Sequence, residues 1–239
     1  MGRFADAIPS LRESVRIHLA AGDLPGAARS QLNLAMAERA AADPGAASAS
    51  AARLRDLTQG AVQQVRERGG DAGADRQLEA ELLAASGWLD ALLALDAGDV
   101  DRAQALSPPA SAELAGSSQM RGRIETLRSA IAIRDGRFAE AVRLAVAGRT
   151  ESAQANDPSE VAHAWGLEGA GDAGMGDWPG ARGAYLAAVA VEERIGGGAR
   201  MAADLRQLAM ISEHLGDSGA ARLYSLRADA ILAAMAEPR

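Results

Sequence analysis

A short glycine-led motif recurs along the chain at intervals close to forty residues. The copies are GDLPGAA at Gly22, GDVDRAQ at Gly98, DGRFAEA around Gly136, GDWPGAR at Gly176 and GDSGAAR at Gly216. Successive glycines are 76, 38, 40 and 40 residues apart, and Gly60 lies at the middle of the double interval. A fixed period of this length is typical of arrays in which one supersecondary unit is repeated and stacked. We expect a less regular copy of the unit to have its turn at Gly60.

Each copy has the residues of a turn between two antiparallel helices. Glycine adopts the left-handed backbone that ends a helix, and a following aspartate caps the next one. Proline is favoured in the first turn of a helix, where Pro25 and Pro179 stand. Alanine occurs five residues after every motif glycine, and its small side chain lets two helices approach closely. The expected caps are Asp23, Asp99, Asp177 and Asp217, and the alanines are Ala27, Ala103, Ala141, Ala181 and Ala221.

Composition indicates the same fold class. The chain has 239 residues, of which 48% are hydrophobic but only 3% aromatic, and helix-favouring residues outnumber strand-favouring ones. Apolar residues recur at helical spacing in the segment from Leu205 to Leu215. We therefore expect an all-α protein, with about eleven or twelve helices.

Several residues resemble the signature of the tetratricopeptide repeat (TPR) family, in its forty-residue bacterial form. They are the Leu-Gly-Asp at 215–217, the alanine five residues after each glycine, Trp165 followed by Gly169, and Tyr185 with Ala188. The resemblance is strongest over 159–235. It implies a right-handed superhelix of stacked antiparallel helical hairpins, known as an α-solenoid.

The resemblance implies one array over 1–239, with clear repeats at about 120–157, 158–197 and 198–236. Residues 45–97 carry no clear unit, and the SPPAS sequence at 107–111 should shorten one second helix. Arg137 stands where the other copies have a capping aspartate.

The segment from Gly169 to Gly174 reads G-x-G-x-x-G, which is also the pattern of dinucleotide-binding loops. Such a loop follows a strand and opens a helix. Here the capped helix start Asp157-Pro-Ser-Glu160 precedes the glycines, so we expect them to lie inside a helix. Five glycines between Gly166 and Gly176 should make this helix the weakest of the array, or bend it.

No catalytic constellation is recognisable, so we expect a protein that is not an enzyme and binds no cofactor or metal. Cysteine is absent, which removes disulfides and thiolate chemistry. The three histidines, His18, His163 and His214, form no metal-binding motif. The acidic segment from Asp96 to Asp101 lacks the spacing of a calcium loop.

By analogy with the family, the first helices of the hairpins line a concave groove. The predicted groove residues are Arg12, Arg16, Trp88, Arg123, Arg134, His163, Arg206, Met210 and His214, with Leu92 and Thr126 on the same stripe. Arginine, tryptophan and methionine on one surface suit a partner peptide with acidic and apolar anchors. The expected function is therefore a protein-interaction scaffold or adaptor, which the resemblance places in bacterial regulatory systems.

Two alternatives remain open. One is a self-assembling structural protein, with a contact at Ile231, Leu232 and Met235 of the last helix. The other is a domain that senses a small ligand inside the superhelix. The net charge of −7 and the lack of a long basic run disfavour nucleic acid, and no apolar run is long enough for a bilayer. We expect a cytoplasmic protein, or a periplasmic one if a leader has been removed.

Overall fold

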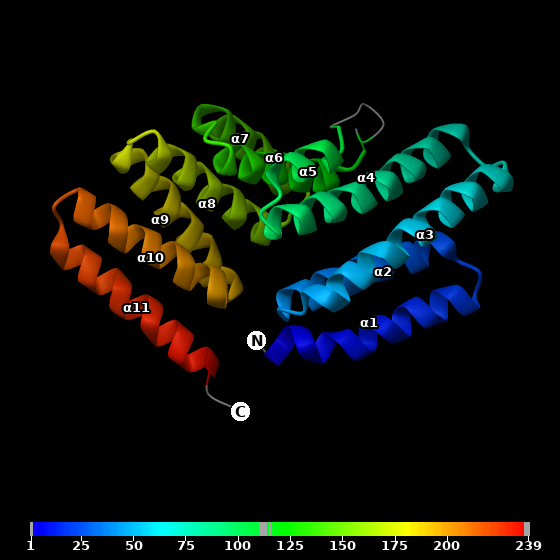
Figure 1. Ribbon diagram of the computed structural model, residues 1–239, viewed down its shortest axis with the longest axis horizontal. Coiled ribbons are helices and arrows are strands. Elements are labelled where there is room, and N and C mark those ends of the chain that lie inside the picture. The colour runs from blue at the N-terminus through cyan, green and yellow to red at the C-terminus, as the bar shows by residue number, and fades with distance from the viewer. Residues whose placement is uncertain (1, 110–113, 115, 237–239) are drawn as a thin grey trace. The chain divides into compact units, whose positions relative to one another are not determined.

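The computed structural model describes residues 2–109, 114 and 116–236 of the chain (Figure 1). Over these residues it has eleven helices and no strand, so the prediction of an all-α fold is confirmed. The helices are α1 (Gly2–Ala20), α2 (Leu24–Ala40), α3 (Pro44–Arg68), α4 (Ala72–Asp96), α5 (Val100–Leu106), α6 (Ser118–Arg134), α7 (Phe138–Gln154), α8 (Pro158–Gly174), α9 (Trp178–Ile195), α10 (Gly198–His214) and α11 (Ser218–Ala236).

The contacts of the chain group into two compact units, Met1–Met120 and Arg121–Arg239, where the sequence suggested one array. In the first unit α2 packs on α1, α3 and α4, and α4 also packs on α5. In the second unit each helix from α7 to α11 packs on the next one along the chain. The hairpins α8/α9 and α10/α11 are visible as pairs of antiparallel helices in Figure 1.

The predicted turn chemistry is present at the motif glycines. Gly22, Gly98, Gly136, Gly176 and Gly216 have φ between 68° and 81°, the left-handed region that favours glycine. The four predicted aspartates each accept a hydrogen bond from a backbone N–H in the first turn of the following helix. Arg137 makes no such cap hydrogen bond, as its side chain has no acceptor to offer.

The alanines five residues after these glycines lie at the centre of the hairpins. Four of them are 0% exposed, and Ala221 is 3% exposed. A larger side chain at these positions would push the two helices apart, so the small residue permits the close crossing.

The expectation for Gly60 is wrong. Gly60 lies inside α3, and the turns of this region are at Ala42, with φ 58°, and Gly69, with φ 61°. Helices α3 and α4 have 25 residues each, against 17 in α2. The 76-residue interval between Gly22 and Gly98 therefore contains α3 and α4 as one long hairpin. The helix continues through Gly60 because buried residues recur on one face from Ala47 to Val65.

Helix α5 has only seven residues, and the backbone is extended at Ser107, where the proline-containing segment begins. The shortening of a second helix was predicted from that segment. The last two residues of that segment, 110–111, lie outside the described residues.

The glycine cluster lies inside α8, without the strand and loop of a dinucleotide site. Its members contact neighbouring helices closely. A Cβ at Gly169 would lie 2.7 Å from the ring of Tyr185, and one at Gly174 would lie 2.3 Å from the ring of Phe138. The cluster therefore serves close packing of α8 against α7 and α9.

Candidate functional site

The first predicted groove residues, Arg12 and Arg16, lie on the exposed side of α1 and bind acidic side chains of their own unit. Arg12 donates to Glu38 at 3.1 Å, and Ser50 donates to the other oxygen of the same carboxylate at 2.6 Å. Glu38 is 3% exposed, so these two donors satisfy a buried charge. Arg16 pairs with Glu13 on the same helix. Both arginines are therefore already paired with carboxylates of their own unit.

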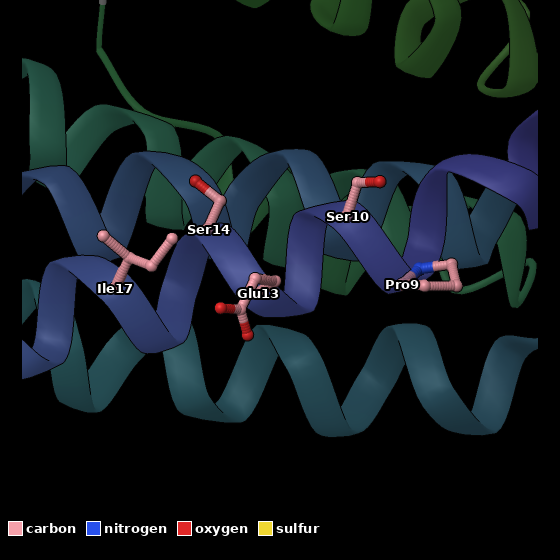
Figure 2. Close-up of a pocket in the computed structure, with 5 residues that line it drawn as sticks. All are labelled: Pro9, Ser10, Glu13, Ser14 and Ile17. Atoms are coloured by element: carbon pink, nitrogen blue, oxygen red, sulfur yellow. The ribbon is translucent and has the colours of Figure 1, made fainter.

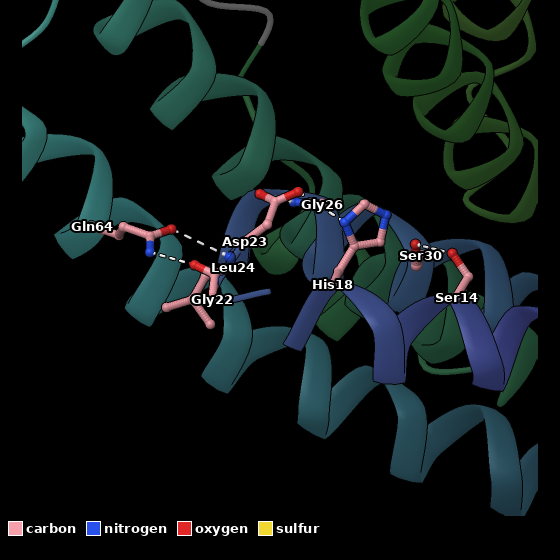
Figure 3. A network of polar contacts seen from close by, with 8 residues as sticks. All are labelled: Ser14, His18, Gly22, Asp23, Leu24, Gly26, Ser30 and Gln64. Carbon is pink, nitrogen blue, oxygen red and sulfur yellow. Dashed lines mark hydrogen bonds and ion pairs between the residues drawn. The ribbon is translucent and has the colours of Figure 1, made fainter. Parts of the chain in front are cut away.

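A polar network links α1, α2 and α3 around the first turn of the chain (Figure 3). The imidazole of His18 lies 2.8 Å from the carboxylate of Asp23, which also caps α2 through the N–H of Gly26. From α3, Gln64 accepts from the N–H of Leu24 and donates to the carbonyl of Gly22. The network holds the α1/α2 turn against α3.

An open hollow lies along α1 beside Pro9, Ser10, Glu13, Ser14 and Ile17 (Figure 2). All five residues come from one helix. The hollow is therefore a surface depression without converging polar groups, unlike the concave pockets that bind small ligands.

The prediction that Trp88 offers its side chain to a partner is wrong. Trp88 is 5% exposed and lies in the core of the first unit, on the buried face of α4. An aromatic residue at helical spacing packs inside whenever another helix covers its face, and α4 is covered by α2, α3 and α5. Leu92 on the same helix is half-buried.

In the second unit, polar side chains connect the first helices α6, α8 and α10. Thr126 of α6 donates to Glu160 of α8 at 2.5 Å, and His163 Nδ1 lies 3.1 Å from the same carboxylate oxygen. Arg200 of α10 donates to the backbone carbonyl of Ser159 at 2.8 Å. We call Thr126, Ser159, Glu160, His163, Arg200 and Asp204 the polar seam.

The carboxylate of Glu160 is the centre of the polar seam. Burial alone would raise its pKa, but the hydrogen bond and charge of His163, the hydrogen bond of Thr126 and the charge of Arg200 lower it to about 2. Glu160 is therefore ionised at neutral pH. It orients His163, whose side chain is 37% exposed.

Asp204, on α10, forms the deeper end of the polar seam together with Glu192 of α9. Both carboxyl groups are buried, at 8% and 1% exposed. Burial, and then the charge of Asp204, raises the pKa of Glu192 to about 7. Burial raises the pKa of Asp204 to about 6 against the opposing charges of Arg200 and His163. Gly166 of α8 lies beside Asp204, and a Cβ there would make an ordinary van der Waals contact of 3.4 Å with its carboxylate.

The predicted stripe combines two different sides of the first helices. Arg123 and His163 occupy the same position in successive repeats, forty residues apart, and both are partly exposed. Thr126 lies on α6 with Arg123 but is buried against Glu160 of α8. The structure thus brings Thr126 and His163 together through Glu160, which the sequence analysis assigned only to helix capping.

Arg206 and Met210 lie on another side of the repeat. Forty residues earlier, Gly166 and Ala170 hold the same positions in α8, and they pack against α10 and its core. On α10 this side is exposed: Met210 is 46% exposed, and Arg206 lies 3.4 Å from Asp229 of α11. These two residues therefore do not extend the row of Arg123 and His163.

His214 and Arg134 also fall outside that row. The imidazole of His214 stacks on the indole of Trp178, with ring centroids 3.9 Å apart and planes 5° apart. Arg134 is exposed at the last residue of α6. Gly174 of α8 holds the repeat position of Arg134 and His214, forty residues from each, and it packs on Phe138.

Sequence reasoning missed Glu160, Arg200, Asp204 and Glu192 as members of one site. A signal was present for two of them. Asp204 precedes Leu208 by one helical turn and Glu192 follows Ala188 by one turn, so each acid interrupts a buried apolar face. A charged residue at such a position rarely lies inside a protein without a partner.

The structure places no group of three potential metal ligands together within the described ranges. Among the helices that it describes, none has the length and apolarity needed to cross a bilayer.

No family model matches the chain, and no curated protein matches it. Among solved structures, nineteen chains match, including the crystal structure of BtubC (BKLC) from P. vanneervenii. That structure superposes with a TM-score of 0.66 at 18% sequence identity, covering 100% of this chain and 96% of that chain. A likeness at this identity shows a shared all-α fold.

Proposed function

We propose that the chain is a TPR-like, non-catalytic scaffold that binds a segment of another protein on the first helices of its second unit. The observation that carries the proposal is a set of basic side chains on three successive first helices. Arg123 of α6 and His163 of α8 share one repeat position, and exposed Arg200 lies on α10. Basic groups placed on successive helices suit a partner segment with spaced carboxylates.

The contacts beneath these side chains support preorganised binding. Glu160 holds His163, and the carbonyl of Ser159 holds the guanidinium of Arg200. A group that is already oriented loses less conformational entropy when a partner binds. The proposed partner carries acidic anchors for Arg123, His163 and Arg200, which we call the basic row, and apolar anchors beside them, as in a bacterial regulatory complex.

The test is capture of partners from native lysate by the wild-type chain and by an Arg123→Glu/Arg200→Glu variant, quantified by mass spectrometry. A protein that binds Arg123, His163 and Arg200 should be captured by the wild type and not by the variant. With the purified partner, each substitution should weaken binding about tenfold, the loss expected for one charge-assisted hydrogen bond.

The matched control is Arg53→Glu/Arg143→Glu, which makes the same charge change at exposed positions of α3 and α7. Circular dichroism melting should show that both variants remain folded. If both capture the same proteins as the wild type, the assignment of the basic row is wrong. Equal losses in the two variants would indicate a nonspecific charge effect and would also contradict it.

A further inference from the structure

The outward side of α11 carries a stripe of apolar residues. Leu223, Leu226, Ala230 and Ala233 recur at spacings of three, four and three residues, which places them on one side of the helix. Leu223 is 64% exposed and Leu226 is 59% exposed, and both alanines are exposed. Single exposed leucines are ordinary, but a continuous apolar stripe indicates a contact. We call these four residues the α11 stripe.

The α11 stripe differs from the contact that the sequence suggested. Ile231 and Leu232 are partly buried and pack against the core of the second unit. Met235 is 41% exposed, and its sulfur would lie 2.9 Å from a Cβ at Gly198. The apolar surface that α11 leaves open is therefore centred nearer its middle, on Leu226.

A second side of α11 is polar, and this side faces away from the preceding hairpin. Forty residues earlier, α9 uses Tyr185 and Val189 to pack against α10 and α11. At the equivalent positions α11 has Ser225 and Asp229, both exposed. End-to-end stacking of hairpins would bury these polar groups at a cost, so it is disfavoured.

We propose that the α11 stripe is the contact surface of a symmetric dimer, in which two copies of α11 pair antiparallel about a twofold axis near Ala228. In this arrangement Leu226 faces Ala230 of the second copy, and Leu223 faces Ala233, because both pairs are centred on residue 228. Every layer then combines one large and one small side chain, which is the complementarity that close helix packing requires. This dimer goes beyond the proposed function, which concerns the first helices.

The charges beside the α11 stripe are compatible with contact between two copies. Arg227 pairs with Glu193 of α9, and Asp229 pairs with Arg206 of α10. A twofold axis brings each side of a helix close to its own copy, so unpaired charges would repel each other. Here each flank carries an internal ion pair. Arg222 lies six residues from the centre of the contact at residue 228, so the two copies of Arg222 are twelve residues apart along the helix axis. At 1.5 Å per residue this is about 18 Å, too far for strong repulsion.

The size of the contact predicts a reversible dimer. Helix α11 has 19 residues and is about 28 Å long. One pair of such helices buries less than the roughly 1,200 Å² at the lower end of stable interfaces. The dimer should therefore form and dissociate as the protein concentration changes.

The test is sedimentation velocity of the 239-residue chain over a range of concentrations. The wild type should show a monomer–dimer equilibrium. Leu226→Glu should raise the dissociation constant by roughly a hundredfold, because the dimer would bury two carboxylates against apolar side chains. Leu186→Glu is the matched control, since Leu186 has the same repeat position on α9 and is 39% exposed. A wild type that stays monomeric, or equal effects of the two variants, would overturn the proposal.

Three further variants test the antiparallel register. Ala230→Leu should weaken the dimer by setting leucine against leucine, and Leu226→Ala should weaken it by leaving a gap. The double exchange should restore it, because each layer again contains one leucine and one alanine. A stronger dimer with Ala230→Leu would indicate parallel pairing and contradict the register. A different protein that binds this stripe while the pure chain remains monomeric would contradict the choice of a second copy.

Discussion

Gly169 of α8 lies against the ring of Tyr185 of α9, so closely that a Cβ on Gly169 would stand 2.7 Å from ring atom Cδ2. Carbon atoms in van der Waals contact are about 3.5–4.0 Å apart, so only glycine fits without movement. Tyr185 is 5% exposed and belongs to the core of the second unit. The missing side chain at 169 therefore sets how closely the two helices of this hairpin approach.

Gly169→Ala should destabilise the protein, although alanine is the better helix former. Overpacking against Tyr185 should cost about 1–3 kcal/mol of unfolding free energy. Gly183→Ala is the matched control, because Gly183 lies in α9 with nothing near the position of a Cβ. That change should add about 0.5–1 kcal/mol through helix propensity. Urea denaturation measures both values, and stabilisation by Gly169→Ala would contradict the packing role.

Amide hydrogen exchange should be faster over residues 166–176 than over 201–215. Four of the five glycines in the first segment lie within α8, where each costs about 0.8–1 kcal/mol relative to alanine, and Gly176 lies in the turn that follows. Packing against Tyr185 and Phe138 offsets only part of this cost. Exchange measured by mass spectrometry on the intact chain would contradict the prediction if both segments were equally protected.

Ala42→Gly should stabilise the first unit by about 0.5–1 kcal/mol. Ala42 has φ 58°, where a Cβ crowds the following carbonyl at a cost of about 1–2 kcal/mol. Glycine removes this strain but adds freedom to the unfolded chain, which cancels part of the gain. The control is Ala41→Gly at φ −79°, where only the entropic loss remains. Thermal or urea unfolding should rank Ala42→Gly above the wild type and Ala41→Gly below it.

The buried pair of Glu192 and Asp204 should make the protein less stable as pH rises from about 4 to about 7. Their pKa values are raised from 4.5 and 3.8 to about 7 and about 6. In this window the folded state binds more protons than the unfolded state, so raising the pH favours unfolding. Each shift exceeds two pKa units, and one unit corresponds to about 1.4 kcal/mol, so the loss for the pair should be on the order of 6 kcal/mol.

The Asp204→Asn variant should flatten this pH dependence, whereas Glu213→Gln, an exposed change of the same kind, should leave it intact.

The ionisation of Glu160 changes stability with pH in the opposite direction. Its pKa is lowered from 4.5 to about 2, so its stabilising contribution is present above pH 4.5 and is lost as pH falls through 2. Denaturation curves between pH 3 and pH 8 would show maximal stability near pH 4–5 for the wild type. Stability that rises steadily to pH 8 would contradict the raised pKa values.

The parts of the fold that could be predicted are those with a local cause. Gly176 and Asp177 end one helix and cap the next through backbone conformation and a hydrogen bond three residues away. Ala181 then lies at the helix crossing because its position follows from the turn. Such features need no knowledge of distant residues, so the recurring motif determined the all-α class and most of the turns.

The candidate site could be predicted only in part. Arg123 and His163 were placed on one stripe by the repeat register, but Glu160, which contacts Thr126 and His163, was assigned to capping alone. The exposure of Trp88 and Arg206 depends on which helix covers each face, and helical periodicity does not contain that information. Gly60 was misplaced because α3 extends for as long as its buried face continues.

By itself, the sequence determined the hairpin unit, since its glycine, aspartate and alanine act within one turn and one helix crossing. The tertiary structure alone decided which side chains meet. Thr126, Glu160 and His163 come together only when α6 packs beside α8, and Asp204 becomes buried only beneath Gly166 and Glu192. The physical reason is that burial and charge pairing depend on contacts between helices. Such contacts join residues far apart in the sequence, and residue spacing within one helix does not indicate them.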